Sequence, residues 1–171
     1  KLSRTMMLGE LSLDGSLQPV KGALPIAIKA REMGFEYLIV PRQNVREAAV
    51  VNRLKVYGAS HIGEVVRFLN DEGGLIPTEI DTRAEFYAQQ TEFDFDFADV
   101  KGQEHVKRAL EVAAAGGHNV IMIGPPGSGK SMMAKRLPSI LPPLSLAESL
   151  ETTQIHSVAG KLARESSLIA R

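Results

Sequence analysis

The eight residues 124–131, Gly-Pro-Pro-Gly-Ser-Gly-Lys-Ser, fit the pattern G-x-x-x-x-G-K-[ST]. An apolar run at 119–123, typical of a buried strand, comes before them, and a helical pattern opens near Gly129. A phosphate-binding P-loop needs this order of strand, glycine-rich turn and helix. The alternative is a turn that merely joins two elements, but the pattern arises by chance in such a chain only about once in a hundred.

The residue types in this motif suit the binding of ATP or ADP with Mg²⁺. Glycines let successive backbone N–H groups turn inward around a phosphate, and the following helix directs its positive end at the same anion. Lys130 would reach the β- and γ-phosphates, and the Ser131 hydroxyl would ligate the Mg²⁺ that bridges them. The predicted nucleotide-binding residues of the loop are Gly124, Pro125, Pro126, Gly127, Ser128, Gly129, Lys130, Ser131 and Met132.

Residues 1–76 alternate strand-like and helix-like patterns, which indicates a second α/β region. Strands are expected at 6–13, 37–40 and 54–57. Helices are expected at 24–33, 45–51 and 62–69, and a further helix at 103–115 precedes the P-loop strand. Pro138 should end or kink the helix that follows the P-loop.

The segment 77–99 differs in composition from the rest, with one basic and seven acidic side chains. It also holds five of the nine aromatic residues, so we interpret 77–97 as a linker that packs on a folded segment rather than as a disordered acidic tail. These aromatic residues are Phe86, Tyr87, Phe93, Phe95 and Phe97.

Composition excludes several classes of site. With no cysteine among 171 residues, disulfides, thiolate metal sites and cysteine nucleophiles are impossible. The four histidines lack the spacing of a zinc site. No apolar run approaches the roughly 18 residues of a membrane span, and no signal peptide opens the sequence. The first residue is Lys rather than Met, which suggests a piece of a longer protein.

Four stretches around the P-loop, at 97–103, 116–119, 135–144 and 155–160, resemble AAA+ ATPases of the magnesium-chelatase-like group, and in particular its ComM/YifB branch. The resemblance implies that the backbone of Val100, Lys101 and Gly102 lies beside the adenine. It also implies a cytoplasmic homo-oligomer, usually a hexameric ring, that acts on branched or single-stranded DNA.

Residues 9–15 and 38–44 resemble the second half of a Lon-type proteolytic domain, an α+β fold of the ribosomal S5 domain 2 type. The lysine of the Lon Ser-Lys dyad would fall at Leu24 or Ile26, neither of which can act as a base. Lys21 is out of register, so we do not expect a protease.

The expected organisation is therefore a partial Lon-like domain at 1–76, the linker at 77–97, and the N-terminal part of an α/β AAA+ domain at 98–171. The family places its Asp-Glu strand, sensor and arginine finger further downstream, so this chain should bind nucleotide and hydrolyse it poorly or not at all. The preferred function is an ATPase motor on DNA. The alternatives are a magnesium-chelatase ATPase subunit, which normally lacks a Lon-like domain, and a nucleotide-binding scaffold without turnover.

Residues 100–171 carry a net charge of +4, which would suit DNA phosphates lining a ring. We favour a mixed solvated face instead, because no aromatic residue beyond Phe97 is available to stack bases. The basic residues concerned are Lys101, Lys107, Arg108, Lys135 and Arg136.

Overall fold

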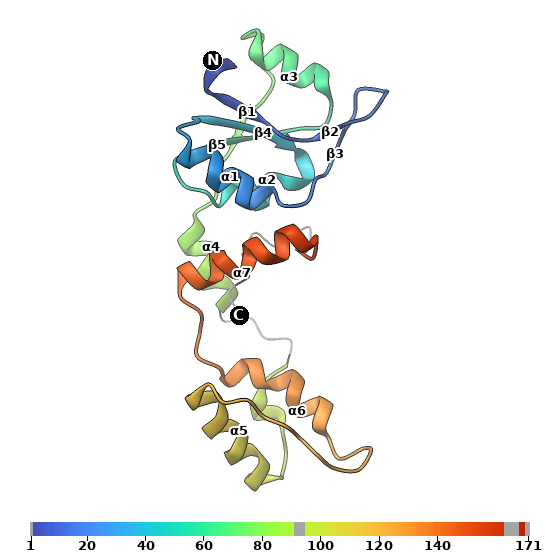
Figure 1. The fold of residues 1–171 in the computed structure, drawn as a ribbon, viewed down its shortest axis with the longest axis vertical. Helices are drawn as coiled ribbons and strands as arrows, with labels where there is room; N and C mark the ends of the chain where they lie inside the picture. Colours follow the sequence, from blue (N-terminus) through green and yellow to red (C-terminus); the bar gives the residue numbers. More distant parts are fainter. Residues whose placement is uncertain (1, 91–94, 163–167, 170–171) are drawn as a thin grey trace. The chain divides into compact units, whose positions relative to one another are not determined.

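The computed structural model describes residues 2–90, 95–162 and 168–169. The chain is a mixed α/β protein with a largely parallel sheet (Figure 1). It divides into two compact units, the first formed by Lys1–Gln89 with Ser145–Ala170 and the second by Gln90–Leu144. The first unit is therefore discontinuous in sequence, and the second is inserted into it.

The sheet of the first unit has the order β1-β4-β5-β6. Strands β1 (Thr5–Met7), β4 (Tyr37–Pro41) and β5 (Lys55–Ala59) run parallel, with Leu38 opposite both Met6 and Val56. The short β6 (Pro77–Thr78) pairs antiparallel with β5 at the edge. The strands predicted at 37–40 and 54–57 are thus confirmed as the two central strands.

Three helices cover the two faces of this sheet (Figure 1). They are α1 (Ala23–Glu32), α2 (Val45–Ala49) and α3 (Ile62–Leu69), as the sequence pattern predicted. Because side chains alternate along a strand, Leu38, Val40 and Val56 pack with α1 and α2, whereas Ile39, Tyr57 and Ala59 pack with α3. Both faces of β4 are buried, as in other parallel sheets covered by helices.

A hairpin of β2 (Glu10–Leu11) and β3 (Leu17–Gln18) follows the first strand. Its turn contains the predicted Asp14-Gly15, where Gly15 has a φ of 86°. The Ser16 backbone N–H and hydroxyl both donate to Asp14 Oδ1, which lowers the pKa of that carboxyl. Short 3₁₀ turns lie at Leu2–Arg4 and Arg42–Asn44.

Part of the predicted linker forms α4 (Thr82–Gln90) and packs on the first unit. Phe86 is buried in the cluster that contains Leu38, and the Thr82 hydroxyl donates to the Val50 carbonyl at 2.8 Å. Tyr87 is exposed, and Phe93 lies outside the described residues. Phe86 is thus part of the core of the first unit, whereas the assignment of 77–97 as a linker stays a prediction.

Helix α7 (Leu146–Ala159) belongs to the first unit and packs against α1. It begins with a capping box, in which the Ser145 hydroxyl accepts from the Glu148 N–H and the Glu148 carboxylate accepts from the Ser145 N–H. Donation by the Ser145 hydroxyl and N–H lowers the pKa of Glu148. Although α7 lies in the stretch 98–171 expected to form one AAA+ domain, that domain assignment stays a prediction.

A stripe of small polar residues, Ser149, Thr153 and Ser157, forms the buried face of α7. The Ser149 hydroxyl donates to the Ile169 carbonyl at 2.5 Å, and the Ile169 N–H donates to Thr153 Oγ1 at 2.8 Å. The neighbouring Leu168 is 1% exposed and joins the main core of the first unit. The hydroxyls of Ser149 and Thr153 thus provide hydrogen-bond partners for the backbone carbonyl and N–H of Ile169.

Glu47 connects three helices of the first unit. Its Oε1 accepts from the Leu24 backbone N–H at 3.0 Å, near the start of α1, and from the Ser157 hydroxyl on α7. Asn44, at the start of α2, donates to its Oε2 at 3.2 Å. In addition, the Gly22 N–H donates to the Ser157 carbonyl at 3.2 Å.

The described residues of the second unit form the 3₁₀ turn η3 (Phe97–Asp99), α5 (Glu104–Gly116), α6 (Lys130–Arg136) and the 3₁₀ turn η4 (Leu137–Ile140). The helices predicted at 103–115 and after Gly129 are confirmed, and the latter ends just before Pro138, as expected. A small core of the second unit is made of Phe97, Val100, Leu110 and Met133.

The prediction of a buried strand at 119–123 is wrong for the described chain. These residues form no strand, and Ile121 and Ile123 are 84% and 89% exposed. A strand must exchange backbone hydrogen bonds with a neighbour, and the second unit offers none among its described residues. Apolar composition alone therefore did not produce a strand here.

Candidate functional site: the glycine-rich loop and its surroundings

The glycine-rich loop runs from residue 124 to the start of α6, and two of its three glycines have conformations that other residues rarely adopt. Gly127 and Gly129 have φ values of 80° and 84°. A Cβ at Gly127 would meet open space, so backbone conformation rather than crowding favours glycine there. Gly129 is the N-cap of α6, which turns the chain from the loop into the helix.

The ammonium group of Lys130 lies inside the loop. It donates to the carbonyl oxygens of Gly124 at 2.9 Å and Pro125 at 2.8 Å, and to Ser128 Oγ at 3.1 Å. All three acceptors are neutral. An ammonium group binds anionic oxygens more strongly than neutral ones, so a phosphate placed in the loop would compete well for this lysine.

Gln103 connects the loop to the segment that precedes α5. Its Nε2 donates to the Ser128 carbonyl at 3.3 Å. Gln103 has a φ of 55°, and the preceding Gly102 has a φ of 70°. A left-handed conformation is costly for a residue with a Cβ, so the surroundings must hold Gln103 in place.

A cavity of about 450 Å³ opens beside the loop within the second unit. Gly124, Pro125, Ser128 and Lys130 give it a polar side. Its apolar side comes from α5 and the exposed run at 120–123, with contributions from Val106, Ala109, Leu110, Val120, Ile121, Met122 and Ile123. Ligand sites commonly combine an apolar lining with a few polar groups in this way.

The other predicted site residues lie around this loop. Ser131 is exposed in the first turn of α6, where a hydroxyl is accessible to a metal ion. Met132 is half-buried and packs against the core that contains Met133. Val100 is only 2% exposed, whereas Lys101 and Gly102 are exposed, so Val100 offers its backbone rather than its side chain. That these residues bind a nucleotide stays a prediction.

Three further residues near the loop were not singled out for this role from the sequence. The sequence indicates only that a helix starts at Gln103, because a left-handed backbone conformation at a non-glycine residue has no sequence signature. Asp99 and Arg136 form an ion pair at 3.6 Å between η3 and α6. The pairing joins residues 37 positions apart, which no local pattern reveals.

The basic residues of the second unit are largely engaged by neighbours. Lys107 pairs with Glu104 at 3.3 Å and Arg108 with Glu111 at 3.1 Å, each one helical turn away. Arg136 pairs with Asp99, and Lys135 lies 5.9 Å from the centre of the Phe95 ring. These charges form a mixed surface, in line with the interpretation favoured from the sequence.

In the ranges 2–90, 95–162 and 168–169, no group of three or more histidine, aspartate or glutamate residues is arranged to hold a metal ion. In the same ranges no helix has the length and apolar character needed to span a membrane.

Comparison with known proteins gives matches in both units. Residues 96–171 match the family model described as magnesium chelatase, subunit ChlI. Residues 1–44 match the model described as subunit ChlI of Mg-chelatase.

Three curated relatives show the extent of the similarity. The uncharacterized protein Rv2897c of Mycobacterium tuberculosis is 45% identical over 173 residues, covering 100% of this chain and 33% of the relative. Competence protein ComM of Haemophilus influenzae is 39% identical over 160 residues, or 92% of this chain and 31% of the relative. An archaeal Lon protease of Archaeoglobus fulgidus is 43% identical over 51 residues, or 30% of this chain and 8% of that protein. The chain spans about a third of the length of its most similar relatives among these.

Proposed function

Because this chain belongs to the magnesium-chelatase-like AAA+ group, in the ComM/YifB branch, we propose that its second unit binds ATP with Mg²⁺. The observation that carries the proposal is the position of Lys130, whose ammonium group lies within hydrogen-bonding distance of two loop carbonyls and the Ser128 hydroxyl. The test is titration of the complete protein with Mg-ATP, with Lys130→Ala as the blank.

Each loop residue would bind a different part of a nucleoside triphosphate or its Mg²⁺. Lys130 would exchange its neutral acceptors for β- and γ-phosphate oxygens, which are stronger partners because they are charged. The left-handed Gly127 and Gly129 allow the backbone to curve, so that N–H groups face the same anion. Ser131 would direct its hydroxyl to Mg²⁺, which neutralises phosphate charge when bound.

We place the base of the nucleotide beside residues 100–102. This segment directly precedes Gln103, whose side chain donates to the loop at Ser128, so the two segments border the same space. With the Val100 side chain buried, the exposed backbone of Lys101 and Gly102 is available to a purine.

For the first unit, we propose a Lon-like domain of the α+β type that has no peptidase activity. The match to an archaeal Lon protease supports the relationship. Leu24 and Ile26, the two positions at which the dyad lysine would fall, carry no amine, and Leu24 is 0% exposed with its N–H donating to Glu47. Cleavage of casein by the complete protein, abolished by a serine-directed inhibitor, would contradict this proposal.

For the complete protein, we propose a cytoplasmic oligomeric ATPase, organised as a ring, that acts on branched DNA. The proposal rests on the similarity to Competence protein ComM. Mg-ATPase activity of the complete protein should rise when branched DNA is added, and Lys130→Ala should abolish it. Turnover that is indifferent to DNA would favour a chelatase-type ATPase driving metal insertion, and the lack of any turnover would favour a nucleotide-binding scaffold.

A further inference from the structure

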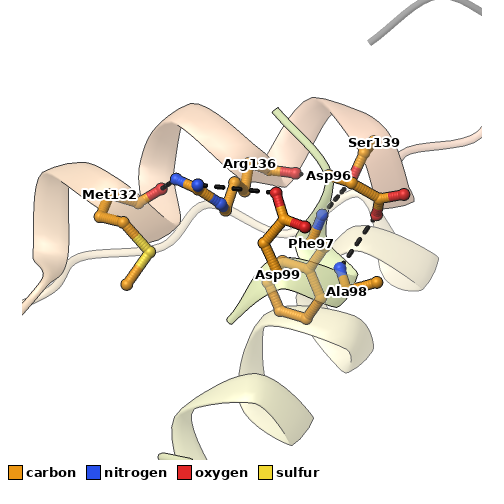
Figure 2. A network of polar contacts seen from close by, with 7 residues as sticks. All are labelled: Asp96, Phe97, Ala98, Asp99, Met132, Arg136 and Ser139. Carbon is orange, nitrogen blue, oxygen red and sulfur yellow. Dashed lines mark hydrogen bonds and ion pairs between the residues drawn. The ribbon is translucent and has the colours of Figure 1, made fainter. Parts of the chain in front are cut away.

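Arg136 ends α6 and lies among side chains and carbonyls from two segments (Figure 2). Its Nη1 donates to the Met132 carbonyl at 3.4 Å, one turn back in the same helix. Its Nη2 lies 3.6 Å from Asp99 Oδ2, and its guanidinium carbon lies 5.2 Å from the centre of the Phe95 ring. Only 17% of this side chain is exposed, which is unusual for arginine.

Ser139, three residues further along, makes a second connection between the same segments. Its hydroxyl accepts from the Phe97 N–H and donates to the Arg136 carbonyl, both at 2.9 Å (Figure 2). On the other segment, Asp96 caps the 3₁₀ turn by accepting from the Ala98 N–H at 2.9 Å. The segment 95–99 is therefore fixed to the end of α6 by its backbone as well as by charge.

Helix α6 thus makes different contacts at its two ends. Lys130 lies within the glycine-rich loop. Arg136 contacts the segment 95–99 about 9 Å further along the axis of α6. Residues 100–102, which we place beside the base, follow this segment directly. Buried Phe97 and Val100 pack on Met133 in the middle of α6, so the segment has little freedom to shift.

From this arrangement we propose that Arg136 and Asp99 are positioning residues that set the base-binding segment relative to the phosphate loop. The inference rests on the proposed nucleotide-binding function. Neither side chain needs to touch the nucleotide, because each acts through the backbone of 97–102. Loss of the pair should weaken the contribution of the base to binding and leave the contribution of the phosphates intact.

The experiment compares two probes, Mg-ADP and inorganic triphosphate, titrated into the complete protein. Arg136→Gln should weaken Mg-ADP about fivefold, as expected for losing one charge-assisted contact, while triphosphate affinity stays within about twofold. Asp99→Asn should act in the same direction. The double variant should bind Mg-ADP no worse than Arg136→Gln alone, because both changes remove one interaction.

Two controls separate this inference from the proposed function. Arg108→Gln removes an arginine that pairs with Glu111 on an exposed face of α5, and it should change neither affinity. Lys130→Ala should weaken both probes, and if it weakens neither, the proposed function itself is wrong. If Lys130→Ala acts as expected but Arg136→Gln weakens both probes equally, or neither, the positioning role is overturned. Should Arg136→Gln fail to fold, Asp99→Asn decides alone, because Asp99 is 60% exposed.

Discussion

The first unit buries both faces of its central strand β4, whereas the second unit leaves the apolar run at 120–123 largely exposed. Leu38 and Ile39, on opposite faces of β4, are 0% and 2% exposed. Ile121 and Ile123, which are as apolar as Leu38 and Ile39 and precede the P-loop, are 84% and 89% exposed. The difference lies in partners: β4 has β1 and β5 on either side, and the described part of the second unit supplies no paired strand.

This comparison shows that the conformation of the glycine-rich loop and the core of the first unit depend on different kinds of contact. The ammonium group of Lys130 in the loop 124–131 is held by local contacts, and the described residues of the second unit form no paired strand beside it. The first unit depends instead on contacts between residues far apart in sequence, such as Thr82 with Val50. Four predictions test how independent the units are.

The largest effect is expected in the core of the first unit. Leu38→Ala removes a fully buried side chain from a packed cluster, and we expect a loss of about 3 kcal/mol of unfolding free energy. Hydrogen exchange in peptides of β4 and β5 measures this loss, and the exposed Leu13→Ala serves as the matched control. Mg-ATP affinity should not change. A parallel loss of affinity would show that the units are energetically coupled.

The second prediction concerns the phosphate loop. Lys130→Ala should weaken Mg-ATP binding at least about tenfold, or roughly 1.4 kcal/mol, because the charged partner of the phosphates is lost. Calorimetric titration measures the affinity, and Lys161→Ala is the control, since Lys161 is exposed in the first unit. Exchange rates in β4 and β5 should stay unchanged. Equal affinities for Lys130→Ala and the parent would refute the prediction.

A third prediction tests whether α7 depends on its contact with Glu47 on α2, within the first unit. Ser157→Ala removes the hydroxyl that donates to Glu47 and should cost about 1 kcal/mol. Exchange in α7 peptides should then be about fivefold faster. Glu47→Gln should act similarly, and Glu151→Gln, on the exposed face of α7, should not. Unchanged exchange in both test variants would mean that packing alone holds the helix.

The smallest effect is expected from pH. The pKa of Glu148 is lowered in the folded state, so its capping contribution is complete above the ordinary glutamate pKa of about 4.3. The contribution is lost as the pH falls through the lowered folded value. Amide exchange in the first turn of α7, corrected for its intrinsic pH dependence, should therefore rise only in acid. Glu148→Gln should remove this pH dependence. If the exchange of the Glu148→Gln variant still rises in acid, another titrating group is responsible.

Most elements of the first unit follow from its sequence. A short apolar run predicted β4, a strand-like pattern predicted β5, and helical patterns predicted the three helices around them. Helix α7 was not predicted, although Ser145 precedes Glu148 by three residues, the spacing of a capping box. No pattern in the sequence indicated that this helix would pack on α1 rather than within the second unit.

For the candidate site, the sequence predicted the loop but not what surrounds it. The motif is local, so its residues and their roles can be named from spacing alone. The contacts of Arg136 with Asp99 and Phe95 join segments separated by the whole loop. Such contacts depend on how the chain folds back, as does the backbone conformation of Gln103. The missing strand at 119–123 has the same origin, because strand formation requires a neighbour as well as a suitable composition.

The insertion of the second unit into the first has a consequence for protein synthesis. Residues 1–89, which hold the four strands of the sheet described above, leave the ribosome before α7, which follows only after the whole of Gln90–Leu144. Until then the Glu47 carboxylate and the Gly22 N–H lack the partners that Ser157 later provides. During synthesis, these four strands can therefore pair before α7 is available to pack against α1. A nonsense mutation near residue 144 should accordingly weaken the first unit, although it leaves every strand of that sheet encoded.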